Sequence, residues 1–235
     1  MNHSPKDRNE APARRQQGGP PLVLLSAISL GLLLGGLAIG VALGGVMPLP
    51  FDAAVGEYFR TEAVAVQVSA VAVFASSVPL AIYAATVSTR LRQLGVTAPG
   101  ATIALAGGVL AAGALGMAGL LVWTLSRPEV SADTALTRAL YFLVFLVGGP
   151  GHVVALGLLL AGMAVPSLIL GLLPRPVAWT GLAIAVAAEL TTLVLVWPGL
   201  AVLLPIARFP ALVWLIVAGA LLPLRRRSTA GTGVR

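Results

Sequence analysis

The sequence predicts an all-α membrane protein, a polytopic bundle of six transmembrane helices with both termini in the cytoplasm. Hydrophobic residues make up 58% of the 235 residues, charged residues only 10%, and the mean hydropathy is +0.97. A soluble globular domain is about 25% charged. Several apolar runs exceed the ~18 residues that mark a transmembrane helix. The basic residues gather near the ends of these runs, where they set topology.

A polar tail precedes the membrane domain and a second one follows it. Residues 1–19 predict a disordered basic cytoplasmic tail, residues 20–224 the six-helix membrane domain, and residues 225–235 a basic cytoplasmic tail. The first apolar run, 21–47, is longer than the ~7–15 residue core of a secretory signal. We therefore expect an uncleaved helix that ends at Pro48.

Four further spans follow from apolar runs of sufficient length. We expect the second at 63–87, the third at 100–125, the fifth at 177–197 and the sixth at 209–222. Trp residues close to both ends of the fifth run are typical of the membrane interface.

The segment before the fifth span is too long for one crossing. Residues 137–173 would form a helix of about 55 Å, whereas the bilayer core is about 30 Å thick. We therefore expect a break at Gly148-Gly149-Pro150-Gly151. The segment then divides into a short apolar helix, 138–147, at the outer surface or dipping inward, and a fourth span, 150–172.

The distribution of basic residues predicts the orientation. With both termini inside, eleven basic residues face the cytoplasm and four face outward, in agreement with the positive-inside rule. The inner ones are Lys6, Arg8, Arg14, Arg15, Arg90, Arg92, Arg175, Arg225, Arg226, Arg227 and Arg235, and the outer ones Arg60, Arg127, Arg138 and Arg208. Because these positions explain the net charge of +7, we expect no nucleic-acid partner.

Glycine and alanine recur at four-residue spacing in three of the spans. Such rows let helices approach closely in lipid, where the hydrophobic drive for association is weak. They can pack within the bundle, against a second copy, or against a partner protein. The rows are Gly36, Gly40 and Gly44; Gly100, Ala104, Gly108, Ala112 and Gly116; and Gly181 and Ala185, continued by Glu189.

Glu189 is the main functional candidate because it is the only acid inside a predicted span. A carboxylate in hydrocarbon costs at least a few kcal/mol and needs a partner, a proton or a water-filled cavity. Its place in the small-residue row predicts that it points into the bundle. Helical rise places Gln67, His152, Arg138 and Arg208 in the same outer half of the membrane. They can form one outward-facing polar pocket, or each can have a structural or interfacial role.

Several chemistries lack their residues. The chain has no cysteine, so disulfides and thiolate sites are excluded. His152 is the only histidine in a span, which leaves too few ligands for bis-histidine haem or zinc. No phosphate-binding loop, zinc-protease motif or nucleophile elbow is present. We therefore expect no cofactor and no metal, and the enzyme class is the least supported.

Short motifs between Ala75 and Pro223 resemble a bacterial membrane family, the domain of unknown function four-three-eight-six. The resemblance implies a compact six-helix domain in the plasma membrane and no particular activity. Pro176 departs from the bulky residue expected after Leu-Pro-Arg. The motifs are Ser-Ser-Val-Pro-Leu (76–80), Gly-Gly-Pro-Gly-His (148–152), Leu-Leu-Pro-Arg (172–175), Ala-Glu-Leu (188–190) and Arg-Phe-Pro (208–210).

Two functional hypotheses remain open. The first is a non-enzymatic accessory or sensor subunit of the plasma membrane, which binds a membrane protein partner through its glycine faces or the 138–147 segment. The alternative is a protein that handles a small solute, an ion or a lipid, in which Glu189 binds a cation or a proton. No inverted repeat favours a transporter.

Overall fold

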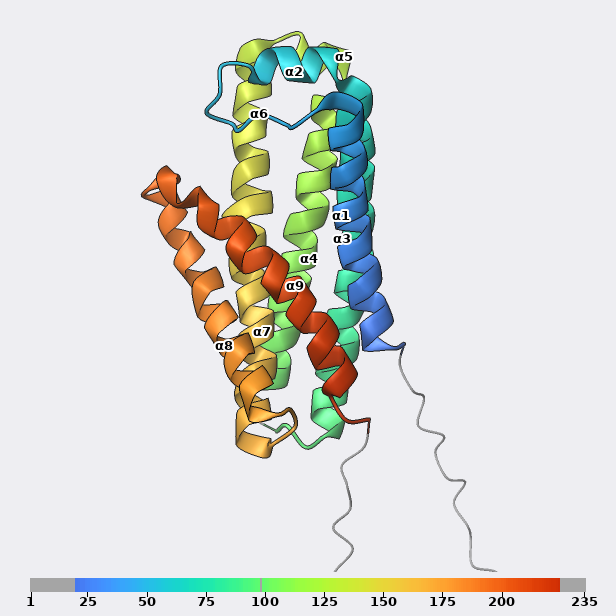
Figure 1. The fold of residues 1–235 in the computed structure, drawn as a ribbon, viewed down its shortest axis with the longest axis vertical. Helices are drawn as coiled ribbons and strands as arrows, with labels where there is room; N and C mark the ends of the chain where they lie inside the picture. The colour runs from blue at the N-terminus through green and yellow to red at the C-terminus, as the bar shows by residue number, and fades with distance from the viewer. Residues whose placement is uncertain (1–19, 98, 225–235) are drawn as a thin grey trace, which may run out of the picture.

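A computed structural model describes residues 20–97 and 99–224, and these residues form helices and connecting loops without a β-strand (Figure 1). Six helical segments in this part of the chain are long and apolar enough to cross a membrane. The structure is therefore that of a multi-pass membrane protein. The tails expected at 1–19 and 225–235 lie outside the described residues.

The helices follow one another with short connections. They are α1 (Leu22–Gly44), α2 (Val55–Thr61), α3 (Ala63–Gln93), α4 (Gly100–Leu125), α5 (Pro128–Ser131), α6 (Thr134–Leu146), α7 (His152–Leu170), α8 (Arg175–Leu190) and α9 (Leu203–Leu221). The π-helical turn η1 (Val147–Gly151) joins α6 to α7, and the 3-10 turns η2 (Thr191–Leu195) and η3 (Pro198–Val202) join α8 to α9.

The predicted spans match these helices closely and differ mainly at their ends. The fifth, expected at 177–197, is α8 from Arg175 continued by η2 to Leu195. The third span coincides with α4, and the first differs from α1 by three residues at its end and one at its start. α3 continues six residues beyond the predicted end at Val87. α9 begins at Leu203 rather than 209, since Pro205 lies in its first turn, where a proline costs no hydrogen bond.

The expected break at Gly148–Gly151 does not occur. Helical structure runs without interruption from Thr134 to Leu170, and α6 stands in line with α7 instead of forming a separate 138–147 helix (Figure 1). Pro150 has no backbone N–H and cannot make the hydrogen bond of a regular α-helix. The helix continues past it because residues Val147–Gly151 adopt a wider π-helical turn. The glycines leave room for this turn: a Cβ on Gly148 would lie 2.8 Å from the Cβ of Ala118.

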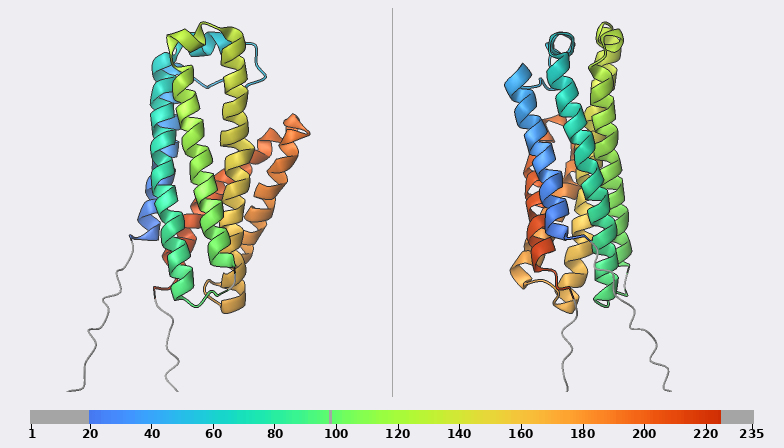
Figure 2. Two further views of the ribbon diagram at one scale, coloured as in Figure 1. Left: turned by 180° about the vertical axis from the view of Figure 1, so that it is seen from behind. Right: turned by 90° about the vertical axis from the view of Figure 1, so that its right-hand side faces the viewer.

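Four tall columns, α1, α3, α4 and the α6–α7 segment, form the main bundle, and the shorter α8 and α9 cover one side of it (Figures 1 and 2). α9 crosses the bundle obliquely towards the base of α1. A Cβ on Gly219 would lie 2.9 Å from the Cβ of Leu22, so the first and last spans meet at the same end of the molecule. α2 and α5 lie across the opposite end, which we call the cap end.

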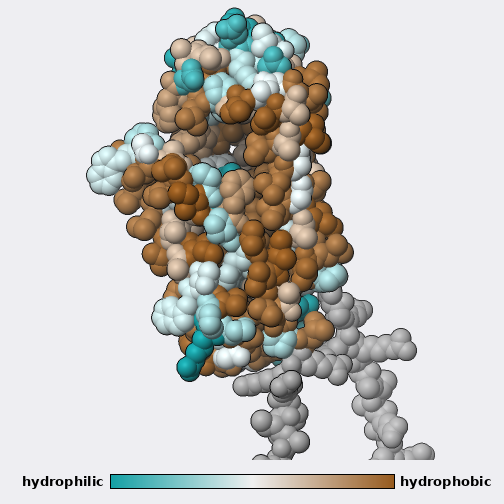
Figure 3. Space-filling model, viewed as in Figure 1, coloured by the Kyte–Doolittle hydropathy of each residue, from teal (hydrophilic) through white to brown (hydrophobic). Residues whose placement is uncertain are grey.

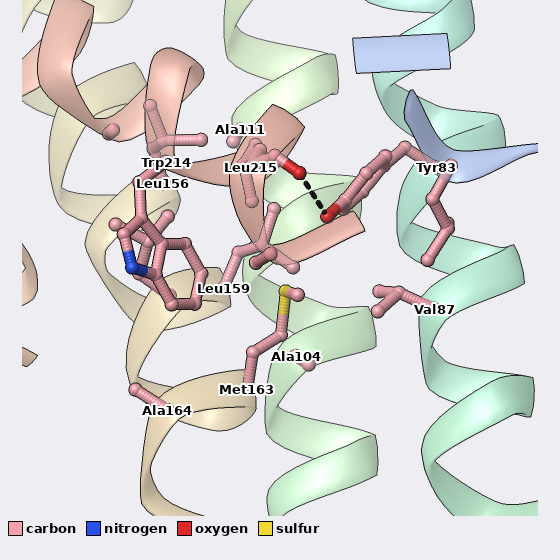
Figure 4. Packing of buried hydrophobic residues seen from close by; sticks show 14 of the residues in the cluster. Tyr83, Val87, Ala104, Ala111, Leu156, Leu159, Met163, Ala164, Trp214 and Leu215 are labelled. Carbon is pink, nitrogen blue, oxygen red and sulfur yellow. Dashed lines mark hydrogen bonds between the residues drawn. The ribbon is translucent and has the colours of Figure 1, made fainter. Parts of the chain in front are cut away.

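The core is apolar and contains few polar links. Tyr83 is fully buried and donates a hydrogen bond to the Leu215 carbonyl (3.0 Å), which ties α3 to α9 (Figure 4). Met163 of α7 packs beside this pair. A second cluster beneath α2 contains Phe59 and Tyr141, whose ring centroids are 5.0 Å apart. The Tyr141 hydroxyl donates to the Pro48 carbonyl (2.7 Å).

Most of the small-residue rows pack within the chain. Gly36 and Gly40 of α1 face Ala72 and Ser69 of α3, and Gly108 of α4 faces Ala84 of α3. On α1, Gly31 has no atom of another residue within 4 Å of an added Cβ, so its face of the helix is open.

Candidate functional site

The five residues predicted to share a polar pocket do not form one cluster. His152 directly follows the η1 turn and Arg208 donates to the Gly148 carbonyl within it, whereas Glu189 is exposed and lines an outward-facing groove beside α7. Gln67 is exposed on α3. Arg138 is exposed on α6 beside Thr134 and Phe142, in a shallow surface depression.

The prediction that Glu189 points into the bundle is wrong. Its side chain is exposed, and the residues of α8 that pack inward are Gly181, Ala185 and Ala188. With 100° per residue, a step of eight positions from Gly181 rotates the side chain by about 80°. Glu189 therefore lies at the edge of the small-residue face rather than on it.

A close contact between α7 and α8 fixes the position of Glu189. A Cβ on Gly157 would lie 2.7 Å from the Cβ of Ala188 and 3.3 Å from Oε1 of Glu189, so only glycine leaves room for both helices here. The α-helix ends directly after Leu190, and the Thr191 hydroxyl donates to the Ala188 carbonyl (2.6 Å). The carboxylate is thus held at the end of a regular helix against a neighbouring one.

Glu189 lines an open groove of about 920 Å³ on the bilayer-facing side of the bundle. We call this the Glu189 groove: α4 contributes residues from Val109 to Met117, η1 and α7 residues from Val147 to Leu158, and α8 and η2 Glu189, Thr192 and Leu195. The walls are apolar. Glu189 is the only charged residue among the described residues that line the groove, so no cation on its walls pairs with the carboxylate.

His152 is fully buried and links two spans. Its Nδ1 lies 2.9 Å from the Ala111 carbonyl oxygen of α4. A carbonyl only accepts hydrogen bonds, so Nδ1 carries a proton in this contact. Nε2 is buried without a partner among the described residues. This geometry ties α7 to α4 directly after the π turn.

Arg208 reaches the same turn from α9. It donates through Nη2 to the Gly148 carbonyl, and its buried Nε has no partner among the described residues. The carbonyl of Gly148 is available because the π turn displaces the regular helical hydrogen bonds.

Sequence reasoning missed Gly113 and Gly157, which shape the Glu189 groove. Their spacing does not distinguish them from the glycines that pack inside the bundle. Only the positions of neighbouring helices show that Gly113 is open, with nothing within 4 Å of an added Cβ, while Gly157 is tightly packed.

No family model, no curated protein and no solved structure matches the chain. The resemblance to the domain of unknown function four-three-eight-six accordingly stays a prediction from short motifs.

Proposed function

We propose that the protein is an accessory or sensor subunit of the plasma membrane that holds a second transmembrane helix in the Glu189 groove. The observation that carries the proposal is an exposed carboxylate on an apolar, bilayer-facing wall, with no cationic residue among the described residues that line the same groove. A charge in this position is costly in lipid, and a cationic side chain on a neighbouring helix offsets the cost.

The shape of the groove supports a helix as occupant. Gly113, Ala114, Gly151 and Ala155 lie on its walls, and small residues let two helix backbones approach closely. Apolar side chains such as Leu110 and Leu158 flank them and offer contacts to a mostly aliphatic partner. The partner chemistry is therefore an apolar helix with one Lys or Arg at the depth of Glu189.

Native mass spectrometry of the protein, extracted gently from its own host membranes, tests the proposal. We expect a second polypeptide on the wild type, much less of it on Glu189→Gln, and none on Gly113→Trp, whose indole fills the groove. Gly31→Trp is the matched control, because Gly31 is equally open but lies on α1 outside the groove. A substitution in the small-residue row of α4, such as Gly108→Leu, does not test partner binding, because Gly108 packs against Ala84 inside the bundle and the change would disturb the fold itself.

Equal retention of the polypeptide by Gly113→Trp and wild type, or a monomer in every sample, contradicts the proposal. A small ligand that is present on the wild type and lost on Glu189→Gln supports the alternative, in which this carboxylate binds a solute or ion.

A further inference from the structure

A second, more enclosed cavity of about 190 Å³ lies between α1, α3 and the start of α9, beneath the cap end. It exists because α9 crosses obliquely and meets α1 only towards the base, so that the outer part of α1 diverges from it (Figure 1). The surface is hollowed in this region, above the start of α9 (Figure 3). The cavity and the Glu189 groove have no lining residue in common.

Arg208 is the only charged residue that lines this cavity in the described part of the chain. Its one hydrogen-bond partner there, the Gly148 carbonyl, is neutral, and its Nε has none. Glu62 lies against Gly44, next to the lining residue Gly45, and does not itself line the cavity. A guanidinium in an apolar site without a carboxylate needs an anion, and its planar fork suits phosphate oxygens.

The remaining walls indicate an amphiphile rather than a hydrated ion. Leu33, Leu37, Val73 and Phe209 give the cavity an apolar surface. Its volume lies below the ~300–1,000 Å³ typical of pockets that enclose a whole small molecule. The space accommodates a headgroup whose chains remain in the bilayer beside α1 and α9.

Two hydroxyl groups can share the anion with Arg208. Ser69 and Tyr58 both line the cavity, from α3 and α2. Burial, with a smaller effect from nearby Glu62, raises the pKa of Tyr58, so its phenol stays protonated at neutral pH. The hydroxyl makes a long hydrogen bond to the Gly45 carbonyl (3.5 Å), which it must release to donate to an anion. No acid lines the cavity, so no carboxylate on its walls binds the ammonium of a zwitterionic headgroup, and Glu62 lies outside it against Gly44.

We propose that this cavity binds the phosphate group of an anionic lipid through Arg208, with its acyl chains between α1 and α9. The site is distinct from the Glu189 groove and does not depend on the proposed partner helix.

Lipid binding by the full chain tests the proposal. The protein is reconstituted in nanodiscs of phosphatidylcholine doped with phosphatidylglycerol, and retained lipids are counted by native mass spectrometry. We expect the wild type to retain phosphatidylglycerol over phosphatidylcholine. Arg208→Gln should weaken this about tenfold or more, the usual effect of losing a charge-assisted hydrogen bond. Arg138→Gln, an exposed arginine outside the cavity, should leave it unchanged.

A second pair of variants decides the matter if Arg208→Gln does not fold. Val73→Phe fills the cavity from α3 and should abolish retention, whereas Val71→Phe, on the exposed face of the same helix, should not. In a further arm, inorganic phosphate is added to protein in pure phosphatidylcholine. A rise in melting temperature that Val73→Phe abolishes supports the site with free phosphate as its source.

Equal retention of phosphatidylglycerol by the wild type, Arg208→Gln and Val73→Phe, without a phosphate response, overturns the proposal. Equal retention of the two lipids by the wild type, again without a phosphate response, overturns it as well.

Discussion

Gly107 and Gly162 lie where the backbones of α4 and α7 approach each other closely. A Cβ on Gly107 would lie 2.5 Å from the Leu159 nitrogen and 2.8 Å from the Ala155 carbonyl oxygen, and one on Gly162 would meet the backbone of Ala104. These neighbours are backbone atoms, which cannot rotate away. The sequence predicts that small residues pack such helices, but spacing alone does not show which glycine is essential.

We therefore expect opposite effects from the same substitution at two positions of α4. Gly107→Ala should lower stability by about 1–3 kcal/mol, because the helices must separate. Gly113→Ala should be neutral or stabilising by up to about 1 kcal/mol, since its Cβ meets open space and alanine favours helix. Thermal unfolding in detergent measures both. A Gly107→Ala variant as stable as the wild type would show that α4 and α7 are not so closely packed.

The sequence identifies Glu189 as a candidate functional residue but does not determine the direction of its side chain. An acid within an apolar run is visible in the sequence, and the structure places it on the wall of a groove. Its direction is not visible, because a helix turns about 100° per residue and a four-residue row drifts away from its starting face. His152 and Arg208 meet at η1 because of tertiary packing, which a linear depth estimate does not contain.

At the scale of the elements, the α6–η1–α7 column determines the shape of the outer half. The sequence indicates an irregularity at 148–151, and its type depends on the surroundings: α4 packs against Gly148, and Arg208 binds the Gly148 carbonyl. With these contacts, a π turn replaces the expected break. The continuous column then carries Tyr141 to the loop between α1 and α2.

The hydroxyls of Tyr141 and Tyr83 should stabilise two different parts of the fold, the α1–α2 connection and α9. Tyr141→Phe removes the bond to Pro48 and should speed amide hydrogen exchange in residues 48–61, while Tyr83→Phe removes the bond to Leu215 and should speed it in α9. Each bond contributes about 0.5–1.5 kcal/mol, so exchange should rise several-fold locally. Each variant is the control for the other. The same exchange pattern in both variants would contradict this assignment.

At the scale of the whole molecule, composition and apolar run length predict the class of fold, and the structure confirms six helices able to span a membrane. α1 begins and α9 ends at one end of the bundle, as an even number of crossings requires. The lateral order of the helices could not be predicted, since it depends on contacts between distant residues. Nor does the fold show which end faces the cytoplasm, which stays a prediction from the arginines.

Single cysteines test this orientation, and the chain contains none of its own. Ala132→Cys lies at the cap end and Gln93→Cys at the opposite end, both exposed. In intact cells a membrane-impermeant maleimide should label Ala132→Cys, and Gln93→Cys only after permeabilisation. The reverse pattern would place the termini outside, and no labelling of either in intact cells would argue against the plasma membrane.

The unequal heights of the helices have a consequence for the surrounding lipids. The segment from Arg175 to Leu195 measures about 31 Å along its axis, close to the thickness of a bilayer core, whereas the apolar part of α3, residues 63–87, measures about 37 Å. One molecule thus presents two hydrophobic lengths to the same membrane. The bundle must tilt, or the bilayer must be thinner along α8 and α9 than along α3, so lipids of different chain length should sort to opposite flanks of the protein.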